Sequence, residues 1–123
     1  MKKSSILLPL LAVSMMAFAG SSSEGLVTIP LATDYGAFIF SAGTPTNKPS
    51  CSTATAGNYA VNLNTAGGRA IQALVLTAYA NGKSLRVDGK GICESIQTDR
   101  ESVNYVYIVE VNGVRLAGPL TSK

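Results

Sequence analysis

Carboxylates are the side chains best able to do acid–base chemistry in this chain of 123 residues, because it contains no histidine. Glycosidases pair two carboxyl groups for such chemistry. Each carboxylate here falls in a pattern that predicts a solvated loop or the solvent face of a strand, and the serines have no histidine to act as their base. The sequence therefore predicts a binding protein with no catalytic residue, and hydrolysis is the least favoured alternative. The carboxylates considered for it are Asp34, Asp88, Glu94, Asp99, Glu101 and Glu110.

The first 19 residues have the pattern of a signal peptide. Lys2 and Lys3 precede an apolar run over residues 6–19 that ends with small residues at Ala17 and Ala19. A charged region, an apolar region and a small-residue cleavage site follow one another in this order in exported proteins. The run is too short to span a bilayer comfortably, because about 20 apolar residues are needed. We therefore predict cleavage after Ala19 and a periplasmic or secreted protein without membrane insertion.

The two cysteines, Cys51 and Cys93, allow a single pairing. In an oxidising compartment an even number of cysteines indicates disulfide formation. Zinc or redox chemistry lacks ligands, since the chain has no histidine and no Cys-x-x-Cys pair. The charged segment Asp99-Arg100-Glu101 has too few oxygen ligands for calcium and is expected to be a solvated turn. The sequence predicts a Cys51–Cys93 disulfide, no metal and no cofactor.

The net charge of +3 on the full chain depends largely on the predicted signal peptide. Removing residues 1–19 takes away two of the ten basic side chains and none of the seven acidic ones, which leaves a net charge of +1. Nucleic-acid binders neutralise many phosphates with Lys and Arg, and the basic residues here are spread along the chain without interleaved aromatics. Nucleic acid is therefore not an expected partner.

The first half of the mature chain predicts strands and one long loop. Residues 20–25 are small and polar and are expected to form a flexible leader. Apolar, β-branched segments at residues 26–32 and 37–41 flank turn-forming residues, which predicts an antiparallel pair. Residues 43–57 are rich in Thr, Pro, Ser and Gly, which predicts a long loop tethered by the disulfide. Residues 58–63 alternate as a third, half-buried strand.

An amphipathic helix is predicted over residues 66–80, because apolar residues recur there at steps of three and four. A capping residue precedes this segment and Asn-Gly follows it, as is typical of helix ends. The residues of this pattern are Asn64 or Thr65 at the N-cap, Ile71, Leu74, Val75 and Ala78 on the apolar face, and Asn81-Gly82 at the end.

Two further strands are predicted after the helix. Residues 84–89 alternate and lead towards Cys93, and residues 103–111 place Tyr105 and Tyr107 on one face with Val109 and Val111. We expect this face to be buried against the helix, with a binding surface as the alternative. Asn112-Gly113 is a strong hairpin signal and predicts a short return strand through Leu116.

The predicted order is three strands, a helix and two strands, in a single mainly β domain over residues 26–123. An OB-fold, which is a five-stranded Greek-key barrel, has this order with its helix between strands 3 and 4. We therefore expect an OB-fold with one helix and one disulfide.

Several short segments give the chain a family resemblance from about Tyr35 to Val109. In order, they are Asn47-Lys48-Pro49 followed by Cys51, a Tyr-Ala-Val strand, a small-residue helix ending in Asn81-Gly82-Lys83, then Leu85-Arg86-Val87 and Gly91-Ile92-Cys93. This arrangement resembles the B-subunit family of subtilase cytotoxin and its typhoid-toxin relatives. The resemblance implies an OB-fold, a homopentameric ring that binds sialylated host glycans, and an enzymatic A subunit as partner.

The resemblance also suggests a ligand-binding position. Where the family's subunits contact sugar through a serine, this chain has Tyr35, with Asp34 beside it. A tyrosine ring stacks on the apolar face of a sugar, whereas an adjacent carboxylate disfavours an anionic one. Asp34 and Tyr35 are thus the candidate ligand-binding residues, and a tyrosine that merely packs in its turn is the alternative. A stand-alone periplasmic module that binds a protein or peptide, without a toxin partner, is the alternative function.

Overall fold

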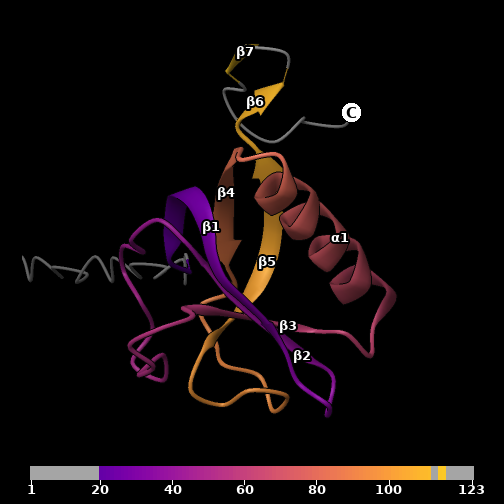
Figure 1. Cartoon of the computed structure of the whole chain (residues 1–123). Coiled ribbons are helices and arrows are strands. Elements are labelled where there is room, and N and C mark those ends of the chain that lie inside the picture. Colours follow the sequence, from indigo (N-terminus) through magenta and orange to yellow (C-terminus); the bar gives the residue numbers. More distant parts are fainter. Residues whose placement is uncertain (1–19, 112–113, 116–123) are drawn as a thin grey trace, which may run out of the picture.

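Five strands of the protein hydrogen-bond to one another in a closed ring, and one helix packs against it (Figure 1). The computed structural model describes residues 20–111 and 114–115. The chain is mainly β with one helix between the third and fourth strands, as predicted. The elements of the ring are β1 (Ser22–Ala32), β2 (Ala37–Ala42), β3 (Tyr59–Asn62), α1 (Ala66–Ala80), β4 (Ser84–Gly89) and β5 (Glu101–Ile108).

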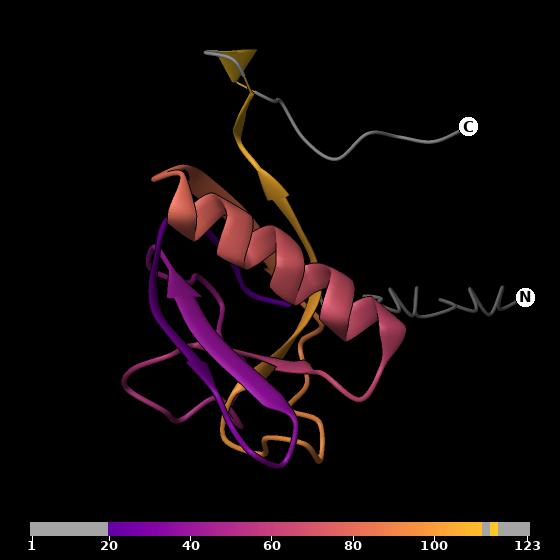
Figure 2. The same cartoon turned by 45° about the vertical axis from the view of Figure 1, so that its right-hand side comes forward.

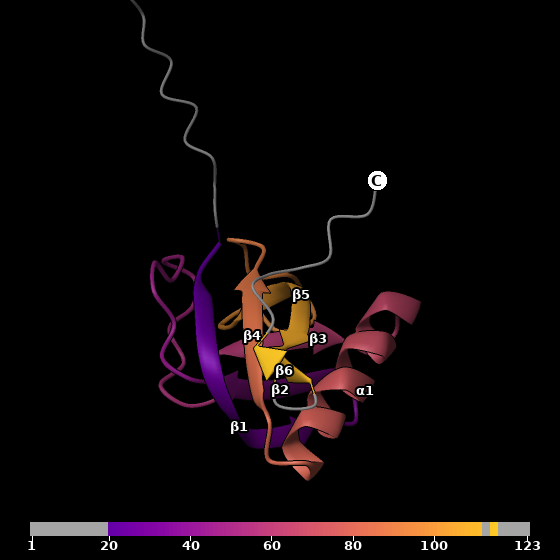
Figure 3. The ribbon, with the colours of Figure 1, turned by 90° about the horizontal axis from the view of Figure 1, so that it is seen from above.

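The order of strands around the ring is β1-β2-β3-β5-β4, and β4 pairs with β1 to close it. All of these pairs are antiparallel except β3 with β5, which are parallel and match Tyr59 with Glu101 and Ala60 with Ser102. Seen from above, the five strands surround a common interior, with α1 at one side (Figure 3).

Strand β1 begins at Ser22, so the expected flexible leader over residues 20–25 is wrong for most of its length. Residues 22–26 pair with β4, beginning with Ser22 opposite Asp88, and the second half of β1 pairs with β2. The register with β2 shifts between Thr28 and Leu31, and Ile29 within this irregularity has a φ of 54°. Such a bulge bends a strand, which allows one strand to serve two partners. The first residues of this strand are polar, so the sequence did not indicate a strand there. Backbone pairing with β4, and not apolar side chains, keeps them in place.

The interior is filled by alternate residues of the strands and by a narrow stripe of the helix. Phe38, Phe40 and Tyr59 are its largest side chains, and Val75 and Ala78 of α1 are fully buried against them. Figure 2 shows α1 lying along the ring. Val75 and Ala78 confirm part of the apolar face predicted for the helix. The third strand is not half-buried as predicted, because Ala60 is buried as fully as its neighbours Tyr59 and Val61.

The helix has the predicted boundaries, and the capping residues at its two ends account for them. Thr65 is the N-cap, and its hydroxyl accepts a hydrogen bond from the backbone N–H of Gly68 at 2.9 Å. At the other end Asn81 is the C-cap, and Gly82 has a φ of 60°. Glycine adopts this left-handed conformation without the steric cost that other residues have.

The chain after β5 forms a short hairpin beyond the ring (Figure 1). The long strand predicted over residues 103–111 is interrupted at Val109, which is buried and donates its N–H to Ser84 O at 3.1 Å. Strands β6 (Glu110–Val111) and β7 (Val114–Arg115) pair antiparallel on the two sides of the predicted turn. The turn residues Asn112 and Gly113, the return through Leu116 and the predicted signal peptide lie outside the described residues. Within the described ranges, no helix has both the length and the apolar character needed to cross a membrane.

Candidate functional site

Three loops gather at the end of the ring opposite the β6–β7 hairpin (Figure 1). They are the β1–β2 turn at residues 33–36, the β2–β3 loop at residues 43–58 and the β4–β5 loop at residues 90–100. We call this end the loop-end surface. Loops at one end of a rigid sheet are common positions for binding residues.

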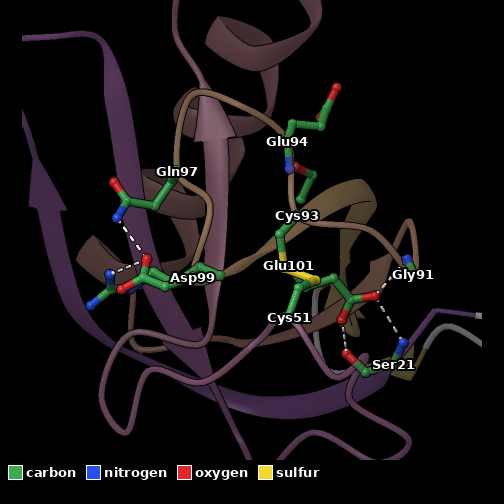
Figure 4. Close-up of a disulfide and its surroundings, with 10 residues drawn as sticks. Ser21, Cys51, Gly91, Cys93, Glu94, Gln97, Asp99 and Glu101 are labelled. Carbon is green, nitrogen blue, oxygen red and sulfur yellow. Dashed lines mark hydrogen bonds and ion pairs between the residues drawn. A yellow bond between two sulfur atoms is a disulfide. The ribbon is translucent and has the colours of Figure 1, made fainter.

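The predicted disulfide joins two of these loops and is confirmed (Figure 4). Cys51 of the β2–β3 loop bonds to Cys93 of the β4–β5 loop, with their Cα atoms 6.0 Å apart. Backbone hydrogen bonds reinforce the contact, since Thr53 and Ala54 both donate to the carbonyl oxygen of Asp99, at 3.1 and 3.2 Å. The long loop is thereby fixed along much of its length.

Arg100 is a second connection between the same loops. Its Nε donates to Gly57 O at 2.7 Å, its Nη2 donates to Ala56 O at 3.0 Å, and its Nη1 lies 3.1 Å from Asp99 Oδ1. The segment Asp99-Arg100-Glu101 is therefore not the solvated turn that its charges suggested. Charged donors satisfy carbonyl oxygens that the irregular loop leaves without strand partners.

The two candidate ligand-binding residues occupy the β1–β2 turn on the loop-end surface. Asp34 is exposed, and Tyr35 is 53% exposed while its hydroxyl donates to Gln97 Oε1 at 2.6 Å. Gln97 in turn donates from Nε2 to Asp99 Oδ1 at 2.7 Å, and this bond, followed by Arg100, holds the pKa of Asp99 below its usual value. The Tyr35 ring is thus held by its polar tip with much of its surface open to solvent. This differs from a tyrosine packed into its own turn.

Sequence reasoning missed Gln97, which is 62 residues from Tyr35. No local pattern distinguishes it from other polar loop residues. Its role follows only from the ring topology, which brings the β1–β2 turn and the β4–β5 loop to the same end.

A hollow of about 200 Å³ is lined in part by the β4–β5 loop. The first turn of α1, strand β3 and this loop enclose it, with Asn62, Lys90, Glu94 and Asn104 among its lining residues. Lys90 Nζ lies 3.1 Å from Glu94 Oε1, and this contact, with a further hydrogen bond from Ser102, holds the pKa of Glu94 below its usual value. The β4–β5 loop therefore borders both the hollow and Tyr35.

A second exposed surface lies on the outer face of β4 and β5. Tyr105 and Tyr107 stack there with ring centroids 6.4 Å apart and planes 16° apart. They lie opposite Asp88 and Arg86 of β4, which pair at 3.4 Å. Burial and then a hydrogen bond with Asp88 raise the pKa of Tyr105. We call this the tyrosine face.

The expectation that Tyr105 and Tyr107 are buried against the helix is wrong. Val103, Val106 and Ile108 pack on the core, so the tyrosines between them point outward. The register of β5 with β4 shifts between Asp88 and Gly89, which changes the phase of alternation after Val103. On β5, Val103, Val106 and Ile108 therefore face the interior, and the rings of Tyr105 and Tyr107 lie outside.

Glu101 was predicted to be solvated, and this prediction is wrong. It is 1% exposed and accepts hydrogen bonds from Ser21 N at 3.0 Å, from Gly91 N at 2.7 Å and from the Ser21 hydroxyl (Figure 4). The Ser21 hydroxyl also lies 3.3 Å from that of Tyr59. Burial is the main cause that raises the pKa of Tyr59, and the charge of Glu101 acts in the same direction. This buried carboxyl group connects the residue before β1 to the β4–β5 loop through its hydrogen bonds.

Three of the described carboxylates form ion pairs. Asp88, Glu94 and Asp99 pair with Arg86, Lys90 and Arg100, respectively. Within residues 20–111 and 114–115, no group of three or more Cys, Asp or Glu side chains is arranged to hold a metal ion. Comparisons with protein-family models, curated proteins and solved structures find no match.

Proposed function

We propose that the protein is an exported, non-catalytic binding module with an OB-fold, and that it binds glycans at the loop-end surface. The strand order with a parallel β3–β5 pair and a helix between β3 and β4 supports this fold. An OB-fold binds ligands through the face of strands 2 and 3 and through the loops between strands 1 and 2 and strands 4 and 5.

Part of that usual binding region is covered in this protein. Every residue of β2 is buried. The β2–β3 loop covers its outer side, since a Cβ at Gly57 would lie 2.5 Å from Ile39 Cγ2. The disulfide and Arg100 hold this loop in place. Ligand binding is therefore expected at the two remaining loops, which contain Tyr35 and Gln97.

The proposal rests above all on the hydrogen bond between Tyr35 and Gln97. It joins the two loops and holds an exposed aromatic ring at a fixed position. Such a ring offers an apolar face to a sugar, and the neighbouring amide and carboxylate offer hydrogen bonds to its hydroxyl groups. Because Asp34 is beside Tyr35, whereas Asp99 is paired with Arg100, a neutral glycan is the expected ligand.

Export and oligomeric state are further parts of the proposal. The disulfide is compatible with an oxidising compartment outside the cytoplasm. A B-subunit-like protein would assemble as a homopentamer and bind an A subunit. Light scattering on the mature protein tests this, because a stable pentamer supports a toxin-type B subunit and a monomer contradicts it.

Glycan-array binding tests the site. We expect Tyr35→Ala to weaken binding at least tenfold, which corresponds to about 1.4 kcal/mol, and Asp34→Ala to weaken it less. Tyr35→Phe keeps the ring and removes only the bond to Gln97, so intermediate binding is expected. Tyr79→Ala is the matched control, because Tyr79 is similarly exposed, at 52%, but lies on α1. Unchanged binding by Tyr35→Ala and Asp34→Ala would remove these two residues from the site.

The tyrosine face supports the second candidate function, which is binding of a protein or peptide without a toxin partner. Tyr and Arg are enriched at the centres of protein interfaces, and Tyr105, Tyr107 and Arg86 lie together there. Selection from a displayed peptide library distinguishes the two functions. Peptides that bind the wild type and Tyr35→Ala but not Tyr107→Ser would favour the tyrosine face.

A further inference from the structure

Glu101 is a buried carboxyl group whose observed hydrogen bonds all come from neutral donors. Two are backbone N–H groups and the third is the Ser21 hydroxyl. Among the described residues it is in none of the ion pairs, and Lys90 of the neighbouring loop pairs with Glu94. Burying a carboxylate without a cation is costly. The surroundings of Glu101 therefore favour a positive charge.

The backbone of Gly20 lies directly against this carboxyl group. A Cβ placed on Gly20 would be 2.6 Å from Glu101 Oε2 and would collide with the carbonyl oxygen of Gly89. The next residue, Ser21, is 1% exposed, donates its N–H to Glu101 and accepts a hydrogen bond from Gly89 N at 2.8 Å. Gly20 is thus fixed at the edge of a closely packed pocket that admits no side chain at this position.

Gly20 is also the residue that follows the predicted cleavage site. Hydrolysis of the Ala19–Gly20 peptide bond by a signal peptidase consumes one water, leaves a carboxylate on Ala19 and frees the amino group of Gly20. At neutral pH a free α-amino group is largely protonated, since its ordinary pKa is about 7.7–8.0. Before cleavage the same nitrogen is a neutral amide.

We propose that the ammonium group of Gly20, freed by cleavage, pairs with the buried Glu101 and so completes the fold of the exported protein. This inference rests on the proposed export with cleavage after Ala19. The pair joins the residues just before β1 to the start of β5. Figure 4 shows Glu101 beside the disulfide, with Ser21 close to it. Among the neighbouring charged groups, Asp88 pairs with Arg86 and Lys90 with Glu94, which leaves Gly20 as the cation available to Glu101.

A thermodynamic cycle tests the pair directly. Four mature proteins are compared by thermal unfolding at pH 7: the chain beginning at Gly20, the chain with one added Ala before Gly20, and the Glu101→Gln form of each. The added residue moves the charge away from Glu101. We expect it to lower the Tm by about 5 °C or more with Glu101 present and by less than half as much with Glu101→Gln. Equal decreases in the two backgrounds would overturn the proposal.

Amine labelling tests the same pair without any variant, should Glu101→Gln fail to fold. An ordinary α-amine reacts faster than lysine with acylating reagents at neutral pH, because its pKa is lower. We expect the Gly20 amine of the folded protein to react after the lysines, and to react first once the protein is denatured. Prior reaction in the folded state would contradict the proposal.

The mass of the exported protein distinguishes failure of this inference from failure of the proposed export. A chain that begins at Gly20 supports cleavage after Ala19. If the exported chain begins elsewhere, the cleavage site is wrong, whereas the cycle still reports whether a Gly20 ammonium pairs with Glu101. If it begins at Gly20 and the cycle shows no coupling, export stands and the ion pair is excluded.

Discussion

Arg100 donates a hydrogen bond from its Nε to the carbonyl oxygen of Gly57 at 2.7 Å. The two residues are 43 positions apart and belong to the loops that Cys51 and Cys93 connect. A covalent bond and a charged hydrogen bond therefore fix the same pair of loops at two points. These two loops of the loop-end surface are thus connected to each other, although they consist largely of irregular backbone.

Removing the disulfide should lower stability substantially. Cys51 and Cys93 are 42 residues apart, and closing a loop of this length stabilises a protein by about 2–4 kcal/mol, chiefly by restricting the unfolded chain. We expect Cys51→Ser/Cys93→Ser to unfold at a lower urea concentration with an ordered ring still present. Urea unfolding followed by circular dichroism measures this, with the reduced wild type as control. Equal midpoints for oxidised and reduced protein would refute a stabilising role.

Arg100→Ala should destabilise the protein by about 2–3 kcal/mol, because it leaves the carbonyl oxygens of Ala56 and Gly57 without their charged donor. Arg100→Lys keeps the charge but not the two separate N–H groups, so it should recover only part of the loss. Urea unfolding in the presence and absence of the disulfide measures the coupling. Since both connections hold the same loops, the two losses should not be additive. Full stability of Arg100→Lys would show that charge alone suffices.

Local patterns in the sequence predicted the elements of this fold well where each element's own residues determine it. The helix over Ala66–Ala80 has a capping Thr65, a small apolar stripe and a terminal Gly82, and all of these are local signals. The disulfide followed from having two cysteines and no other chemistry for them. The antiparallel pair β1–β2 followed from the turn between its strands.

Contacts between distant segments were beyond such patterns. Glu101 looks like a solvated residue because its partner Ser21 is 80 residues away and reaches it only through the closure of the ring, while Gly91 approaches it across the β4–β5 loop. The start of β1 was missed for the same reason. Tyr105 and Tyr107 alternate as core residues would, and only a register shift beside Asp88 and Gly89 turns them outward. In the candidate site, Asp34 and Tyr35 were predicted, whereas Gln97 required the three-dimensional arrangement.

Acid should lower the stability of the protein by protonating Asp99 on the loop-end surface. Hydrogen bonding to Gln97 and pairing with Arg100 lower the pKa of Asp99 below its ordinary 3.8. A lowered pKa means that the stabilisation is fully present above the ordinary pKa and is lost as the pH falls through the folded-state value. Because the side chain is 47% exposed, the effect should be about 1 kcal/mol or less. We expect Asp99→Asn to lower the Tm at pH 7 and to approach the wild-type Tm near pH 2. A difference that grows towards low pH would contradict this, and Asp34→Asn is the control.

Gly67 and Gly68 provide a matched pair of substitutions in the first turn of α1. A Cβ on Gly67 would have no heavy atom within 4 Å, so Gly67→Ala should stabilise the protein by about 0.4–1 kcal/mol through its higher helix propensity. A Cβ on Gly68 would collide with the carbonyl oxygen of Asn62 and lie 2.9 Å from Thr65 Oγ1, the atom that caps the helix. Gly68→Ala should therefore destabilise it by about 1–3 kcal/mol. Thermal unfolding of both variants at pH 7 measures the opposite signs. The same sign for both substitutions would mean that the close approach of α1 to β3 at Gly68 does not determine its stability.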